Sequence, residues 1–68
     1  MRRAKKTAGR RLADWLHENE MTQTELAEAL EVSQPSVSKW IRGRDKPGRG
    51  FAERISYKTG IPVEAWSA

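Results

Sequence analysis

The chain of 68 residues lacks cysteine entirely and has a single histidine, His17. Without cysteine, disulfide bonds, iron–sulfur clusters and thiolate zinc sites are all excluded. One imidazole cannot form a histidine metal site by itself. A chain this short predicts one small domain, and we expect that domain to bind no metal and no cofactor.

Long apolar runs are missing as well. No segment approaches the roughly 18 consecutive apolar residues that a transmembrane helix needs. The opening segment MRRAKK is basic, like the start of a signal peptide, but no apolar segment follows it. We therefore expect a cytoplasmic protein with no membrane partner. The carboxylates have no nucleophile or base beside them in a catalytic pattern, so the sequence predicts neither an enzyme nor a small-molecule site.

Charged residues of both signs are present but segregated, with a formal net charge of +4. Residues 1–11 carry six cations and no anion, and residues 32–50 carry five cations against Asp45. Residues 12–31 carry six anions and no lysine or arginine. This segregation is typical of a phosphate-binding face. The alternative is that the cations only keep a small domain soluble.

Apolar residues recur at helical spacing, and no stretch alternates as a strand would, so the sequence predicts an all-α domain. The expected parts are a basic arm at 1–7 and a domain at 8–68, with helices at about 8–19, 23–30, 34–42 and 51–59 and a last turn at 62–66. Thr7 and Ser33 are expected N-caps, and Thr22 with Glu25 forms a T-x-x-E capping box. Gly43 is expected to end the third helix in the left-handed conformation.

The three tryptophans are expected to pack rather than to stack on nucleic acid. Trp15 and Trp40 fall on the apolar stripes of two predicted helices, which favours core packing over a stacking surface for single strands. Trp66 lies in the last turn beside Val63, and it fits either the core or the surface where two copies meet. Ala27 is expected where two helix axes cross closely, since a larger side chain would separate them.

The predicted helix at 34–42 carries a polar stripe of Gln34, Pro35, Ser38, Lys39 and Arg42, with no carboxylate. Amide, hydroxyl and cationic groups on a short helix suit base edges in the major groove of DNA. Gln34 can bond bidentately to adenine, whereas Pro35 offers only apolar contact, for example to a thymine methyl. Lys39 can donate to guanine or to a phosphate, and the hydroxyl of Ser38 fits almost any base edge.

These segments resemble the Xre/Cro family of helix-turn-helix regulators, which includes phage repressors and Cro proteins. The resemblance rests on T-Q-T-E-L-A at 22–27, V-S-Q-P-S-V-S-K-W at 32–40, R-G at 42–43 and T-G-I-P-V-E-A-W at 59–66. It implies a lambda-repressor-like bundle of about five short helices, a helix-turn-helix at about 23–42 and double-stranded DNA as the partner. The family usually has glycine where this chain has Glu31, so we expect Glu31 at positive φ.

The resemblance also implies that Gln23 contacts a phosphate while it steadies Gln34. The full set of expected phosphate-contacting residues is Gln23, Ser36, Arg42, Arg44, Lys46 and Arg49. Two of them have alternatives. Ser36 can help to cap its helix instead, and Arg49, placed in the loop after the recognition helix, can reach an adjacent minor groove.

The sequence thus predicts a sequence-specific transcription regulator, of the type of a Cro-like repressor on a pseudo-palindromic operator. One recognition helix contacts only a few base pairs, so we expect a homodimer on the DNA that meets at Val63 and Trp66. The alternative is an antitoxin-type protein-interaction module that binds DNA secondarily. A sequence-indifferent architectural protein would lack the polar stripe. DNA binding would associate the protein with the nucleoid.

Overall fold

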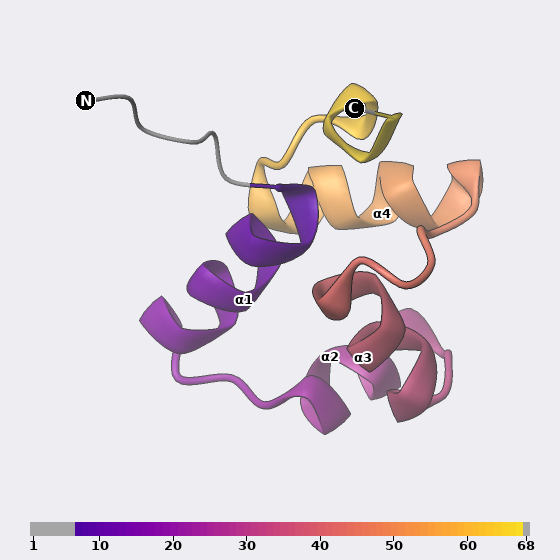
Figure 1. Ribbon diagram of the computed structural model, residues 1–68. Coiled ribbons are helices and arrows are strands. Elements are labelled where there is room, and N and C mark those ends of the chain that lie inside the picture. The colour runs from indigo at the N-terminus through magenta and orange to yellow at the C-terminus, as the bar shows by residue number, and fades with distance from the viewer. Residues whose placement is uncertain (1–6, 68) are drawn as a thin grey trace.

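The computed structural model describes residues 7–67, as a bundle of short helices (Figure 1). Its elements are α1 Ala8–Glu18, α2 Gln23–Leu30, α3 Gln34–Arg42, α4 Arg49–Thr59 and the 3-10 helix η1 Val63–Ser67. This part of the chain contains no strand, which confirms the all-α prediction. None of its helices is both long and apolar enough to cross a membrane. The cations predicted for the N-terminal arm lie outside the described residues: Arg2, Arg3, Lys5 and Lys6.

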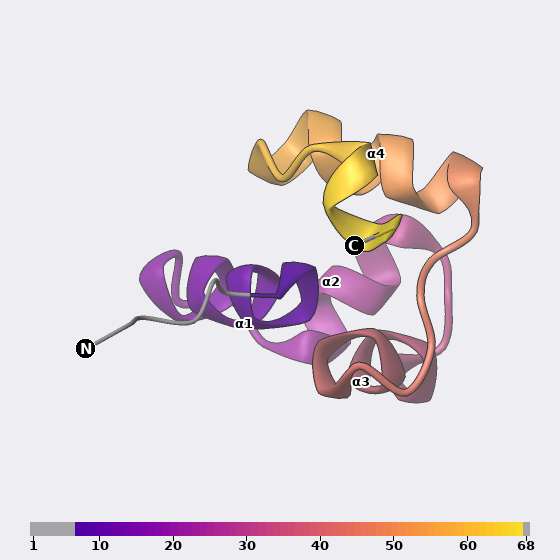
Figure 2. The same ribbon diagram turned by 45° about the horizontal axis from the view of Figure 1, so that its top comes forward.

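The helix-turn-helix consists of α2, a turn at residues 31–33, and α3. In both ribbon views α3 and α4 lie on opposite sides of the bundle, joined by the loop at residues 43–48 (Figures 1 and 2). α1 packs against α3, and η1 packs against α4 and α1. α2 also packs against α3, and the residues on the opposite, outward side of α3 stay exposed, among them Gln34, Lys39 and Arg42.

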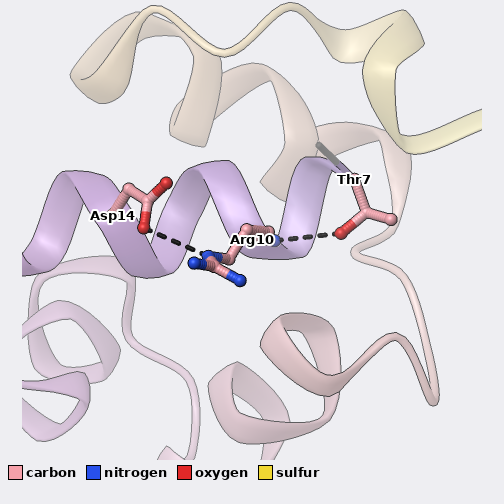
Figure 3. A network of polar contacts seen from close by, with 3 residues as sticks. All are labelled: Thr7, Arg10 and Asp14. Atoms are coloured by element: carbon pink, nitrogen blue, oxygen red, sulfur yellow. Dashed lines mark hydrogen bonds and ion pairs between the residues drawn. The ribbon is translucent and has the colours of Figure 1, made fainter. Parts of the chain in front are cut away.

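Side-chain caps begin the first three helices, as predicted. The Oγ1 of Thr7 accepts from the backbone N–H of Arg10 at 3.1 Å (Figure 3). Thr22 and Glu25 form the complete capping box, with hydrogen bonds of 3.0 and 2.9 Å. Ser33 is the N-cap of α3. Each cap satisfies a backbone donor that a helix start leaves without an intrahelical partner.

Left-handed residues end α2, α3 and α4. Gly43 and Gly60 have φ of 77° and 83°, a region that glycine adopts without steric cost. Glu31 has φ 61°, which confirms the prediction of positive φ at the turn of the motif. Glu20, at φ 53°, takes the same conformation between α1 and α2, and no sequence pattern indicated it. Two glutamates therefore occupy positions that would suit glycine better.

All five elements contribute to one core. Its buried apolar residues are Ala8, Leu12, Leu16, Leu26, Ala27, Leu30, Val37, Trp40, Ala52, Ile55, Ile61 and Trp66. Trp40 is buried as predicted, and its ring lies 6.0 Å from that of Phe51 in α4. Trp15 packs half-buried against the same cluster. The inward face of α3 thus packs against α2 and α1 and meets α4 through the contact between the Trp40 and Phe51 rings.

Trp66 lies in this core with 9 % of its surface exposed. Of the two positions that the sequence allowed for this tryptophan, the structure has the core one. A contact between Trp66 and a second copy stays a prediction. Its Nε1 is buried, and among the described residues it has no hydrogen-bond partner. Val63 is half-buried beside the core cluster.

Gly9 allows α1 to approach α3 closely, a contact that the sequence did not indicate. A Cβ at this position would lie 2.5 Å from the carbonyl oxygen of Trp40 and 2.6 Å from that of Ile41. Both atoms are backbone, so neither can rotate away. The sequence had placed such a crossing at Ala27, which is buried, and had not indicated the size limit at Gly9.

Two limits of the α-helices differ from the prediction, and the last helical turn, η1, lies one residue later than the expected 62–66. α1 ends at Glu18, one residue earlier than expected, and α4 begins at Arg49, two residues before the expected start at 51. Gly48 is the N-cap of α4, and its carbonyl accepts from the N–H of Ala52 at 2.8 Å. The glycines and Pro47 suggested a longer loop, yet Gly50 lies inside the helix. Arg49 therefore belongs to α4 and not to the loop.

Candidate nucleic-acid interface

The polar stripe predicted for α3 lies on its outward side. Gln34, Pro35, Lys39 and Arg42 are exposed, and Ser38 is half-buried. The opposite side of the helix carries the buried residues of α3. All five side chains of the predicted stripe therefore belong to a surface that can reach a partner, with no carboxylate on this helix to repel a phosphate.

Gln34 and Gln23 are joined by a hydrogen bond. The Nε2 of Gln34 donates to the Oε1 of Gln23 at 2.8 Å, across the two helices of the motif. The resemblance implied that Gln23 steadies Gln34, and the structure brings the two amides together in that way. The Oε1 and the second N–H of Gln34 are left for other partners, as is the amide nitrogen of Gln23.

Ser36 serves the start of its own helix. Its backbone N–H donates to the Oγ of Ser33 at 3.4 Å, and the two hydroxyls lie 2.9 Å apart. The sequence allowed Ser36 either to help cap its helix or to contact a phosphate, and these hydrogen bonds correspond to the capping role. The half-buried position leaves part of Ser36 accessible, and its contact with a phosphate stays a prediction.

The loop after α3 presents exposed cations on an ordered backbone. Arg44 and Lys46 are both exposed. The N–H groups of Arg44 and Asp45 donate to the carbonyl of Lys39 at 3.0 and 3.4 Å, which ties the loop to the end of α3. The carboxylate of Asp45 accepts from the backbone N–H of Lys46 at 2.9 Å. The loop therefore starts in a defined direction, with its cationic side chains in solvent.

Arg49 lies in the first turn of α4 and pairs with Glu53. Its Nε lies 3.5 Å from the carboxylate, and both side chains are largely exposed. An exposed pair one turn apart on a helix contributes little to stability, about 0.3–0.5 kcal/mol. A phosphate could therefore replace Glu53 as the partner of Arg49 at small cost.

Arg54 was not among the predicted residues, although it contacts the helix-turn-helix directly. Its Nη1 donates to the carbonyl of Leu30 at 3.1 Å, and its Nη2 to that of Ala29 at 3.5 Å. Its guanidinium carbon also lies 5.8 Å from the centre of the Phe51 ring. The two partners of Arg54 are 24 and 25 positions away from it in the sequence. Local sequence patterns extend over three or four residues and cannot indicate a partner at that separation.

The described part of the chain contains no group of three or more histidine, aspartate or glutamate side chains placed to hold a metal ion. The geometry at α3 instead provides hydrogen-bonding groups on a protruding helix, with cations beside them. Such an arrangement can contact base edges and phosphates at the same time.

Comparison with known proteins identifies the family. The chain matches no curated protein and no solved structure. A family profile described as helix-turn-helix matches residues 12–66, from α1 through η1. Since this match covers most of the chain and includes the exposed helix α3, the protein belongs to the Xre/Cro-type helix-turn-helix family of DNA-binding transcription regulators.

Proposed function

We propose that this regulator is a Cro-like repressor that recognises a pseudo-palindromic operator in double-stranded DNA as a homodimer. The observation that carries the proposal is the hydrogen bond between Gln34 and Gln23 at the exposed start of α3. A side chain held in one orientation can discriminate between bases, whereas a freely rotating one adapts to several.

Gln34 is the principal base-contacting residue in this proposal. Its free Oε1 accepts from the N6 amino group of adenine, and its second N–H donates to N7 of the same base. Gln23 meanwhile keeps the amide plane of Gln34 fixed through the bond at 2.8 Å. The amide nitrogen of Gln23 remains free to donate to a phosphate, so one pair of side chains joins base recognition to backbone contact.

In this proposal, other residues on the outward side of α3 contact base pairs next to the one that Gln34 recognises. Pro35, exposed in the first turn, offers an apolar surface for a thymine methyl. Lys39 and Ser38, one turn further along, contact base edges or the flanking backbone. These side chains lie on the same side of α3 as Gln34, so they meet neighbouring base pairs.

The cations around α3 supply affinity that does not depend on sequence. Arg42 is the last residue of the recognition helix and Arg44, Lys46 and Arg49 follow it, and all four are exposed. Neutralising phosphates releases counterions from the DNA, which makes binding strongly salt-dependent. In this proposal these four residues position the protein on the duplex, while Gln34 selects the sequence.

A homodimer follows from the small size of one recognition helix. Two half-sites related by two-fold symmetry double the number of contacted base pairs, which a repressor needs for useful selectivity. Val63 keeps part of its surface for a partner copy, whereas Trp66 is 9 % exposed and contributes at most its edge. The contact between copies is therefore small, and we expect the dimer to form mainly on DNA.

Selection of binding sites from random duplex DNA tests the proposal. We expect an enriched inverted repeat whose half-sites lie about 10 base pairs apart, centre to centre. Sedimentation on the enriched duplex should give two chains per DNA molecule. A protein that enriches no sequence would be an architectural binder instead. An enriched single half-site with one bound chain would disprove the dimer while leaving base recognition intact.

A further inference from the structure

The carboxyl end of α2 needs more hydrogen-bond donors than its own turn provides. An α-helix leaves its last four carbonyls without intrahelical partners, here those of residues 27–30. The N–H of Val32 donates to the carbonyl of Ala27 at 2.9 Å, and that of Glu31 donates to the carbonyl of Glu28 at 3.2 Å. Two of the four carbonyls are thus satisfied within the motif.

Arg54 supplies the donors for the other two. Its guanidinium bonds to the carbonyl of Leu30 at 3.1 Å and, at a longer 3.5 Å, to that of Ala29. A cation at a helix carboxyl end also interacts favourably with the helix dipole. α2 has no basic residue of its own in its last turn. Arg54, on α4, therefore completes the capping of α2 from outside the motif.

The same guanidinium also reaches the recognition helix through two aromatic rings. It lies 5.8 Å from the centre of the Phe51 ring, and that ring lies 6.0 Å from the ring of Trp40. Trp40 is buried on the inward side of α3. Arg54 is thus linked to both helices of the motif. The turn between these helices contains Glu31, whose left-handed conformation is unfavourable for a residue other than glycine.

We propose that Arg54 is a positioning residue for base recognition, because it holds the end of α2 and the packing of α3 in one arrangement. The inference rests on the proposed function, in that it assumes sequence discrimination by α3. Base contacts require donors and acceptors placed to a fraction of an ångström, whereas long cationic side chains reach phosphates from several orientations. Loss of Arg54 therefore lowers discrimination between sequences more than it lowers binding to DNA in general.

The test compares Arg54→Met and Arg54→Lys with Lys58→Met. Methionine removes both donors and the charge, and lysine keeps the charge but cannot donate to two carbonyls in a planar fork. Lys58 is an exposed cation one turn further along α4, so its replacement controls for the loss of charge. The probes are the duplex enriched from random DNA and a scrambled duplex of the same composition.

For Arg54→Met we expect the ratio of affinities for the enriched and scrambled duplexes to fall about tenfold. Affinity for the scrambled duplex and the salt dependence should stay as in the wild type. The affinity ratio of Arg54→Lys should lie between those of the wild type and Arg54→Met, and Lys58→Met should keep the wild-type ratio. An unchanged ratio in Arg54→Met overturns the proposal. An equal loss on both duplexes with a salt slope lower by about 1 also overturns it, since Arg54 would then contact a phosphate.

Hydrogen exchange in the free protein gives a second readout that needs no DNA. Amides at residues 31–33 should exchange faster in Arg54→Met than in Lys58→Met, after correction for global stability from thermal unfolding. Equal exchange would show that Arg54 does not hold the turn, and the proposal would fail. If the wild type enriches no sequence, the proposed function fails, and with it the role of Arg54 in discrimination. The exchange data then still show whether Arg54 holds the turn.

Discussion

The two ends of α3 are held by different means. At the N-terminal end, Gln34 and Pro35 are exposed, and side chains secure the helix start: the Ser33 cap and the hydrogen bond from Gln34 to Gln23. At the C-terminal end, Trp40 is buried and backbone meets backbone, because Gly9 of α1 lies directly against the carbonyl of Trp40.

This difference separates stability from specificity. The buried end determines where the helix axis lies, and any added atom there must displace backbone. The exposed end presents side chains that contact little of the core, so they can change without moving the helix. We therefore expect substitutions at the buried end to change the stability of the protein, and substitutions at the exposed end to change DNA recognition.

Gly9→Ala should have the largest effect. The added Cβ would lie 2.5 Å from the carbonyl oxygen of Trp40, and α1 would have to move away from α3. Overpacking of this kind costs about 3 kcal/mol of unfolding free energy, measurable by urea denaturation. Gly50→Ala in α4 is the matched control, because nothing lies within 4 Å of a Cβ there, and it should be neutral or slightly stabilising. Equal stability of the two variants would contradict the close approach.

Gln34→Ala should have the next largest effect, and it should change DNA binding while leaving stability nearly unchanged. We expect it to cost about 1–3 kcal/mol of binding to the enriched duplex and to relax preference at one position per half-site. Unfolding free energy should stay within about 0.5 kcal/mol of the wild type, because the side chain is exposed. Equal loss on enriched and random duplexes would place Gln34 among the phosphate-contacting residues.

The sequence predicted features that depend on neighbouring residues and missed those that depend on distant ones. The caps at Thr7, Thr22 and Ser33 involve partners three residues away, so spacing alone indicated them. The left-handed Glu31 followed from the resemblance, because the family usually has glycine at that position. Features such as the close approach at Gly9 depend on how helices cross, which no local spacing encodes.

The candidate site divides in the same way. The stripe on α3 follows from helical periodicity, and it is exposed as predicted. The contacts of Arg54 with Leu30 and Ala29 arise only when α4 folds back onto α2. Trp66 shows the limit of composition as a guide, because an apolar residue near the end of a chain suits a core and an interface equally well.

Glu31→Gly should have a smaller effect, in the turn that leads into the exposed end of α3. Glu31 has φ 61°, and glycine removes a left-handed penalty of about 1 kcal/mol. We expect thermal unfolding to show a gain of up to that size, with sequence preference unchanged. Glu20→Gly, at φ 53° outside the motif, should stabilise the protein similarly. A change in preferred sequence for Glu31→Gly alone would show that the turn conformation itself adjusts the recognition helix.

Single cations in the loop should have the smallest effect. Arg44→Ala or Lys46→Ala removes one exposed charge that follows α3. Affinity should fall about equally on enriched and random duplexes, and the slope of log affinity against log salt should decrease by about 1, as fluorescence anisotropy would show. A variant that alters sequence preference and keeps the wild-type slope would instead mark its residue as base-contacting.

The most direct test of base recognition by the exposed end of α3 is an NMR titration that follows the side-chain amide of Gln34 and the backbone amides of the loop. With the enriched duplex, both the Gln34 amide and the loop residues 43–48 should shift. With a scrambled duplex, the loop should shift and the Gln34 amide should not. Identical shifts of Gln34 on both duplexes, or no shift on either, would contradict the account.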